Sequence, residues 1–241
     1  MWVDDPDIRV SSPDPRERRV AVLLFMATLV CVYLVYGYQW TDGDPLRDGG
    51  TAWESAQFAS ALMAILLAHE MGHYWVARRH GFELSLPYFL PFPMAFGTFG
   101  AIIRLRSLPP NRTALLEMGA AGPLAGFVVA VVVMALGLPE TVPQAVVELP
   151  MARPPPIPEI VDGELTGWAA LLDGLLGHPP LSWIFPPVEP ETLPLLVLAN
   201  PPVMDLVGSV VMGAAPGRYD ILGPLALAGW VGCLLTAINL V

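Results

Sequence analysis

The sequence predicts an all-α polytopic membrane protein with about four transmembrane helices, a short membrane-associated β-hairpin and a proline-rich external loop. Only 14% of the 241 residues are charged and 54% are hydrophobic, which leaves too little polar chemistry to coat a water-soluble globule. Several apolar stretches are also long enough to cross a bilayer. Finally, 15 of the 27 prolines fall between Pro139 and Pro202, which is typical of an extended connection.

The predicted membrane spans follow from length. A bilayer core about 30 Å thick takes roughly 20 helical residues. Three stretches of that length carry no charge, and they cover residues 20–40, 118–138 and 221–241. A fourth stretch, 55–77, is apolar apart from His69, Glu70 and His73. We therefore expect four helices that cross the membrane.

Arginine placement predicts how these spans are oriented, because positive residues near span ends stay on the cytoplasmic side. Nine of the twelve arginines precede the first span or lie between the second and third: Arg9, Arg16, Arg18, Arg19, Arg78, Arg79, Arg104, Arg106 and Arg112. Residues 1–19 are then a cytoplasmic leader, and residues 20–138 hold the first three spans. Residues 139–220 form an external loop, and residues 221–241 form a last span that returns to the cytoplasm.

Two segments do not fit as plain spans or plain loops. Residues 84–107 are rich in aromatic and β-branched side chains and contain three prolines and two glycines that would break a helix. We expect a strand or hairpin there that enters the membrane interface. Residues 192–217 are apolar but interrupted by prolines and by Asp205, and we expect an interfacial or re-entrant piece.

Charge and cysteine content argue against a nucleic-acid-binding protein and against a fold held by disulfides or by paired-cysteine metal sites. The net charge of −10 disfavours nucleic-acid binding, which needs a basic face to displace counterions from phosphates. Cys31 and Cys233 each lie in a long apolar run, so neither a disulfide framework nor a paired-cysteine metal site is expected. The bilayer is thus a predicted partner, and DNA or RNA is not.

The string from His69 to His73 reads His-Glu-Met-Gly-His and carries the chemistry. Two histidines four residues apart lie on one helix face, with Cβ atoms about 6 Å apart, so both imidazoles can bind one Zn²⁺. Glu70 adjoins the first ligand and can act as a general base toward water. Ionisable residues inside a membrane helix cost a few kcal/mol even on mild scales and usually mark function. We therefore predict His69 and His73 as zinc ligands and Glu70 as the catalytic base of peptide hydrolysis.

Three motifs together resemble the site-2 protease family of intramembrane zinc metalloproteases. They are the string at 69–73, the Gly-Thr-Phe-Gly run at 97–100, and Ala-Gly-Pro-Leu-Ala-Gly at 121–126, and the resemblance covers roughly residues 55–138 and the final span. It implies three core helices around the metal and membrane-spanning proteins as substrates. It also implies that the proline-broken strand segment pairs with an extended substrate. Gly122 and Gly126 then line the active-site cleft, or else they permit close helix packing.

The chain departs from that family at the third zinc ligand. The family carries an aspartate on its last core helix, five residues after a proline, and this sequence stops after Asn239, Leu240 and Val241. We expect a fragment of a longer protein, with weak metal binding by the chain alone. Asn239 matches the first position of the motif and would orient substrate or stabilise an oxyanion. Asp205 imitates the aspartate with a different spacing, and we do not expect it to bind metal.

The predicted function is therefore that of a multi-pass zinc metalloendopeptidase of the cell membrane. Its expected substrates are single-span membrane proteins, cleaved within or beside the bilayer in regulated intramembrane proteolysis. Two alternatives stay open from the sequence. The chain is a catalytically incomplete homologue that binds membrane proteins without cutting them, or it is a metal-ion transporter whose ionisable cluster is a transit site.

Overall fold

The computed structural model describes residues 14–41, 43–81, 83–107, 109–141, 202–216 and 222–238, together with the strand residues 160–161 and 164–165. The described elements run in the order α1 (Pro15–Gln39), α2 (Gly49–Arg79), β1 (Tyr88–Pro91), β2 (Thr98–Ile102), α3 (Arg112–Gly137), η1 (Leu138–Glu140), β3 (Ile160–Val161), β4 (Glu164–Leu165), α5 (Pro202–Val211) and α6 (Pro224–Ile238). Within these residues, α1 and the helix that begins at Arg112 are long and apolar enough to cross a membrane. The mostly helical fold with one short hairpin between α2 and α3 is confirmed.

The long helices begin where short polar side chains can bond the free amides of a first turn. The carboxylate of Asp14 accepts from the amide of Arg16 before α1, and the side chain of Asn111 accepts from the amide of Ala114 before α3. Asp48 caps α2 by accepting from the hydroxyl and amide of Thr51 and from the amide of Gly50. The hydrogen bonds from Thr51 and Gly50 lower the pKa of the Asp48 carboxyl, so this cap stays ionised at neutral pH.

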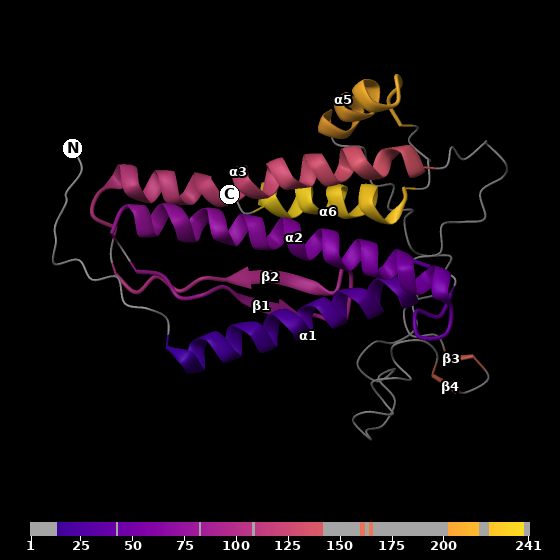
Figure 1. Ribbon diagram of the computed structural model, residues 1–241, viewed down its shortest axis with the longest axis horizontal. Coiled ribbons are helices and arrows are strands. Elements are labelled where there is room, and N and C mark those ends of the chain that lie inside the picture. Colours follow the sequence, from indigo (N-terminus) through magenta and orange to yellow (C-terminus); the bar gives the residue numbers. More distant parts are fainter. Residues whose placement is uncertain are drawn as a thin grey trace.

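Helices α2, α3 and α6 form the core, and they lie side by side in Figure 1. Small residues allow their backbones to approach closely. A Cβ added at Gly232 of α6 would lie 2.7 Å from Ile65 of α2, and one at Gly229 would lie 2.7 Å from Met134 of α3. Leu62, Ile65, Ala130, Met134 and Val231 are buried in this core. The three helices that carry the candidate site are therefore fixed against one another.

The β1–β2 hairpin lies between α1 and α2 (Figure 1). Its strands pair antiparallel, with Tyr88 opposite Ile102, Phe89 opposite Ala101 and Pro91 opposite Thr98, and an irregularity falls between Phe89 and Pro91. An isolated bridge between Leu84, before β1, and Leu105, after β2, extends the antiparallel pairing beyond the strands. The hairpin expected from the prolines and glycines of residues 84–107 is confirmed.

Gly97 at the turn of this hairpin is expected to tolerate no side chain. Its φ is +84°, and a Cβ there would lie 2.4 Å from Cα of Val32 in α1. Left-handed backbone costs a residue with a side chain about 1–2 kcal/mol, and a forced contact in packed structure costs about 1–3 kcal/mol more. We expect Gly97→Ala to lower the free energy of unfolding by about 2–5 kcal/mol, measured by denaturant titration in detergent.

Gly100→Ala is the matched control. Gly100 has a similar φ of +90°, but a Cβ there would meet nothing within 4 Å. This variant should show only the backbone cost of about 1–2 kcal/mol. Equal losses for the two variants would contradict the close packing of the hairpin turn against α1.

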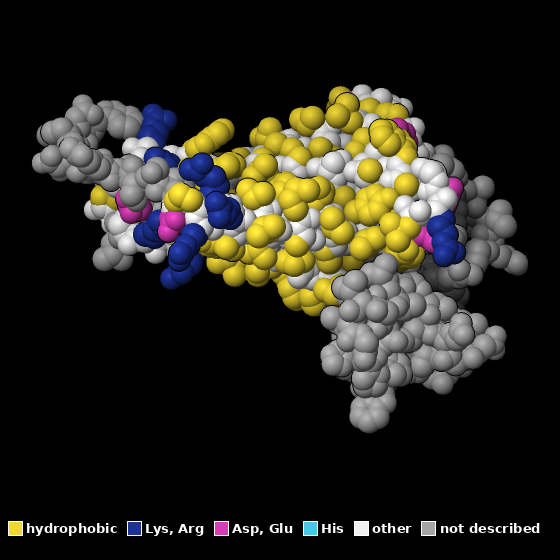
Figure 2. Space-filling view, turned by 60° about the horizontal axis from the view of Figure 1, so that its bottom comes forward, with side chains coloured by type: hydrophobic (Ala, Val, Ile, Leu, Met, Phe, Trp, Pro, Cys, Tyr) yellow, Lys and Arg dark blue, Asp and Glu magenta, His cyan; other side chains and the backbone are white. Residues whose placement is uncertain are grey.

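The two ends of the helices differ in charge. Figure 2 shows apolar side chains over the middle of the molecule, most of the basic side chains at one end and a smaller basic group at the other. We call the first of these ends the arginine-rich end, and it holds Arg16, Arg18 and Arg19 of α1, Arg78 and Arg79 of α2, Arg104 and Arg106 after β2, and Arg112 of α3. The opposite end carries Asp44, Asp48, Glu54 and Glu140 together with Arg47, which pairs with Asp44, and we call it the acidic end.

The segment expected to be interfacial or re-entrant, 192–217, contains α5. This helix has ten residues, which span about 15 Å and are too few to cross a bilayer. It packs on α3 beside η1, and Figure 1 shows it on the outer side of α3. Most of the predicted external loop, 139–220, lies outside the described residues, so its character stays a prediction.

Candidate metal centre

His69 and His73 meet on the face of α2 that packs against α3. Their spacing of four residues places both rings on one side of the helix, with ring centroids 4.9 Å apart and an interplanar angle of 68°. The Nε2 atoms of the two rings are 3.1 Å apart. His69 is buried with 2% of its surface exposed, and His73 is half-buried. The predicted histidine pair is thus brought together inside the helix bundle.

A backbone carbonyl of α3 fixes the ring of His73. Nδ1 of His73 lies 2.8 Å from the carbonyl oxygen of Met118. A carbonyl oxygen can only accept, so Nδ1 carries the hydrogen and the lone pair of the neutral ring resides on Nε2, the atom that faces His69. Metal-binding histidines commonly donate their other ring nitrogen to such an acceptor. This contact could not be predicted from residue types, because every residue carries a main-chain carbonyl that can accept a hydrogen bond.

Glycines of α3 make room for both imidazoles. A Cβ added at Gly122 would lie 2.1 Å from Nε2 of His73, and one at Gly126 would lie 3.0 Å from Cβ of His69. On α2, a Cβ at Gly72 would lie 2.4 Å from the carbonyl oxygen of Ala121. The glycines therefore both line the candidate site and permit close helix packing, the two roles left open by the sequence.

Helix α6 closes the site from a third side. A Cβ at Gly126 would lie 2.7 Å from Cγ2 of Thr236. The Thr236 hydroxyl donates to the carbonyls of Gly232 and Cys233 in its own helix, so its methyl group faces α3. A threonine in an apolar helix is common, so the sequence does not mark Thr236 as a site residue. Only the packing of α6 on α3 shows that it lies near His69. Asn239, three residues further on, lies outside the described residues.

Glu70 follows His69 on α2 and is buried, with 6% of its surface exposed. Its side chain has no hydrogen-bond or ion-pair partner among the described residues. A carboxylate in such a position is costly unless a proton, a cation or water compensates its charge. Nδ1 of His69 is also buried without a hydrogen-bond partner among the described residues. A buried carboxyl group without a protein partner, next to paired imidazoles, indicates a site that a cation can complete.

The histidine pair fits a zinc ion. A tetrahedral ion with Zn–N bonds of about 2.0–2.1 Å holds two nitrogens about 3.3 Å apart, close to the observed 3.1 Å. In the described part of the chain, no group of three or more His, Cys, Asp or Glu side chains gathers around a common point. Asp205 is exposed on α5 and does not join the histidines. The described residues therefore bring two candidate nitrogen donors together, Nε2 of His69 and Nε2 of His73.

His80 and Glu117 join α2 and α3 beside the site. His80 Nε2 lies 2.6 Å from the Glu117 carboxylate, and the two side chains are 22% and 54% exposed. Helix packing brings these two residues, 37 positions apart in the chain, into contact. The contact ties Glu117 and its neighbour Met118 to the end of α2.

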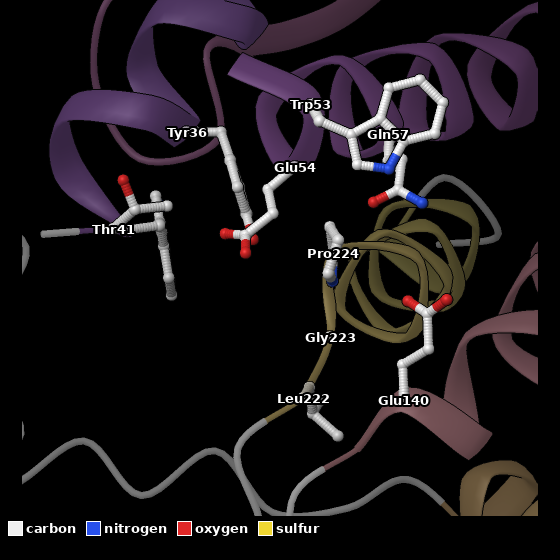
Figure 3. Close-up of a pocket in the computed structure, with 10 residues that line it drawn as sticks. Tyr36, Thr41, Trp53, Glu54, Gln57, Glu140, Leu222, Gly223 and Pro224 are labelled. Atoms are coloured by element: carbon white, nitrogen blue, oxygen red, sulfur yellow. The ribbon is translucent and has the colours of Figure 1, made fainter. Parts of the chain in front are cut away.

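The metal site is distinct from a cavity of about 550 Å³ at the acidic end. Figure 3 shows Glu54 of α2 and Glu140 of η1 on different walls of this cavity, with Tyr36 of α1 beside Glu54. Neither histidine of the pair lines it, nor does Glu70. The candidate metal site therefore lies in the helix interfaces rather than in this opening.

Paired imidazoles and a neighbouring glutamate on a helix are typical of one class of protein, the metallopeptidases. A family model described as "Peptidase family M50" matches residues 57–241. The chain belongs to this family, the membrane-embedded site-2 protease family. The resemblance seen in the three sequence motifs is thereby confirmed.

Curated relatives carry names of the same kind. The chain is 40% identical over 80 residues to "Probable zinc metalloprotease EGY1, chloroplastic" of Arabidopsis thaliana, and the match covers 33% of this chain and 14% of that protein. It is 46% identical over 74 residues to "Probable zinc metalloprotease EGY2, chloroplastic" of Oryza sativa subsp. indica, covering 31% and 13%. The match thus spans about a seventh of the relatives' length. No solved structure matches the chain.

Proposed function

We propose that this chain carries the zinc site of an intramembrane metalloendopeptidase that cleaves membrane-spanning proteins within or beside the bilayer. The proposal rests on one observation: the Nε2 atoms of His69 and His73 lie 3.1 Å apart, and the buried Glu70 directly follows His69 in the sequence. Membership of the M50 family and relatives named as zinc metalloproteases support a metalloprotease. Single-span substrates and a role in regulated intramembrane proteolysis are parts of the proposal.

We further propose that α1, α2, α3 and α6 all cross the cell membrane. The apolar middle of the molecule between two charged ends supports this arrangement (Figure 2). The arginine-rich end then faces the cytoplasm and the acidic end faces outward. Because His69 and His73 belong to the half of α2 that leads to the arginine-rich end, the metal lies nearer the cytoplasmic face.

The residues of the site divide the chemistry between them. His69 and His73 would hold zinc, and a zinc ion bound there would supply Lewis-acid activation of water and of the peptide carbonyl. Glu70 takes a proton from the attacking water and delivers it to the leaving amine. The carbonyl of Met118 keeps the His73 ring oriented. An extended substrate pairs with an exposed strand edge of the β1–β2 hairpin, because a peptide bond inside a helix is shielded until the backbone unwinds.

The zinc assignment is tested by metal analysis. We expect the purified protein in lipid nanodiscs to bind one zinc ion per chain, and His69→Ala to lower zinc affinity more than about 100-fold. That loss exceeds the 10- to 100-fold typical of residues that only support a ligand. Equilibrium titration against a chelator of known affinity measures it.

His80→Ala is the control for this experiment. It removes an imidazole from the same helix end but not from the pair, and its zinc affinity should stay within about tenfold of the parent, the lower bound for a supporting residue. Equal losses in the two variants would show that zinc is not held by His69.

One observation favours a second function, that of a homologue that binds membrane proteins without cutting them. The described residues bring two ligands to the site, whereas catalytic zinc sites usually have three protein ligands. Incubation with a single-span substrate in proteoliposomes separates the two functions. Stable association with no cleavage product would favour the binding homologue, and cleavage would favour the peptidase.

A further inference from the structure

The β1–β2 hairpin is attached to α1 along the whole length of that helix. Phe25 packs edge-on against Phe89, and Gly97 lies against Val32. At the acidic end, the indole of Trp40 donates to the carbonyl of Ala95 at 3.0 Å and stacks on Phe96. The side-chain amide of Gln39 donates to the carbonyl of Pro93. The hairpin turn is thereby held to the last turn of α1.

At the arginine-rich end, the attachment is made by one carboxylate. Glu17 is buried, with a side chain 6% exposed. It accepts from the amide of Leu86 at 2.9 Å, just before β1, and from the guanidinium of Arg106 at 2.5 Å, after β2. Its hydrogen bond is the largest cause that raises the pKa of Arg106. One side chain of α1 thus holds both legs of the hairpin.

The two legs are also joined to each other at that level. The amide of Ser85 donates to the carbonyl of Arg104, and the amide of Arg106 donates to the carbonyl of Glu83, both at 2.9 Å. The hydrogen bonds of Glu17 therefore hold both ends of the hairpin together, not one strand alone.

The hairpin is held much less closely by α2. Helices α1 and α2 pack together near the acidic end, where Tyr36 stacks on Phe58 and the Tyr33 hydroxyl donates to the carbonyl of Pro45. From there they diverge toward the arginine-rich end, with the hairpin between them (Figure 1). Since α2 carries the histidine pair, the place of the hairpin relative to the metal depends on α1.

We propose that Glu17 is a positioning residue for proteolysis: it fixes the hairpin to α1, so that helix and hairpin present one rigid strand edge to the substrate. The family match begins at residue 57, so Glu17 lies on a helix outside it and holds a hairpin within it. The inference rests on the proposed function, because positioning matters only if a peptide is bound and cut.

The test is Glu17→Gln in the full chain, reconstituted in nanodiscs with zinc and a single-span substrate. The amide keeps the size of the side chain but loses the charge that Arg106 pairs with. We expect KM to rise roughly tenfold, the scale of losing one charge-assisted hydrogen bond, while kcat and zinc stoichiometry stay unchanged. Hydrogen exchange of the amides in residues 84–106 should become faster.

Two further variants sharpen the result. Arg106→Gln should reproduce the effect, and adding it to Glu17→Gln should cause little further loss, because both changes break the same contact. Glu54→Gln is the matched control, an exposed glutamate of the acidic end, and should leave KM and exchange unchanged.

The outcomes separate the inference from the proposed function. Unchanged KM and unchanged hairpin exchange in Glu17→Gln would overturn the positioning role, and so would a fall in kcat with loss of zinc, which indicates general damage. If the parent protein binds zinc but cuts nothing, the proposed function fails. Exchange in the hairpin then still decides whether Glu17 fixes it.

Discussion

Glu70→Gln is expected to abolish measurable cleavage while zinc stays bound. The substitution keeps the size of a side chain that is 6% exposed, so packing of α2 should survive. It removes the group that can accept a proton from water and return it to the leaving amine. General acid–base catalysis contributes about 10²–10⁴-fold, so kcat should fall by at least that range while KM changes little.

The measurement is single-turnover cleavage of a reconstituted single-span substrate, with zinc determined in the same preparation. Zinc content separates a chemical defect from loss of the metal. Glu54→Gln, the same change on the same helix but at the acidic end, should cleave like the parent. Turnover by Glu70→Gln within tenfold of the parent would remove Glu70 from the proposed mechanism.

Gly122→Ala is expected to destroy the metal site through packing alone. The added Cβ would lie 2.1 Å from Nε2 of His73 and 2.3 Å from its Cδ2, so the imidazole or α3 must move. Movement of the ring breaks its alignment with His69 and its bond to the Met118 carbonyl. Since a ligand is displaced rather than merely unsupported, zinc affinity should fall more than about 100-fold.

Gly119→Ala provides a close control on the same helix. A Cβ at Gly119 would meet nothing within 4 Å, and alanine favours a helix over glycine by about 0.5–1 kcal/mol. This variant should bind zinc normally and be slightly more stable in denaturant titration. Normal zinc binding by Gly122→Ala would show that His73 does not occupy the position described.

The chemistry of the site was accessible from sequence because it depends on local spacing. His69 and His73 are four residues apart, and the geometry of a helix turns that number into a shared face. The helices and the hairpin were likewise predictable from apolar length and from the placement of proline and glycine. Four membrane crossings stay a prediction, since two described helices meet the length and composition of a span. The roles of His69, Glu70 and His73 also stay predictions until metal and activity are measured.

The supporting contacts were inaccessible because they join residues far apart in the chain. Glu17 contacts Arg106 across 89 positions, and His73 contacts a main-chain oxygen 45 positions away. Trp40 shows the same limit, because its indole holds the hairpin turn through the carbonyl of Ala95, 55 positions away. The local sequence pattern identifies the residues that can carry out chemistry. Tertiary packing determines which other residues keep those side chains in place.

The bond between His73 and the Met118 carbonyl has a thermodynamic consequence. The nitrogen lone pair that would bind metal is set by a neighbouring helix, so ion affinity and the docking of α3 on α2 are coupled quantities. If the ion binds more tightly when α3 is docked on α2, then by linkage the bound ion stabilises the docked helices by the same free energy. Chelation should therefore loosen the α2–α3 contact as well as empty the site, and the thermal midpoint should rise with free zinc concentration.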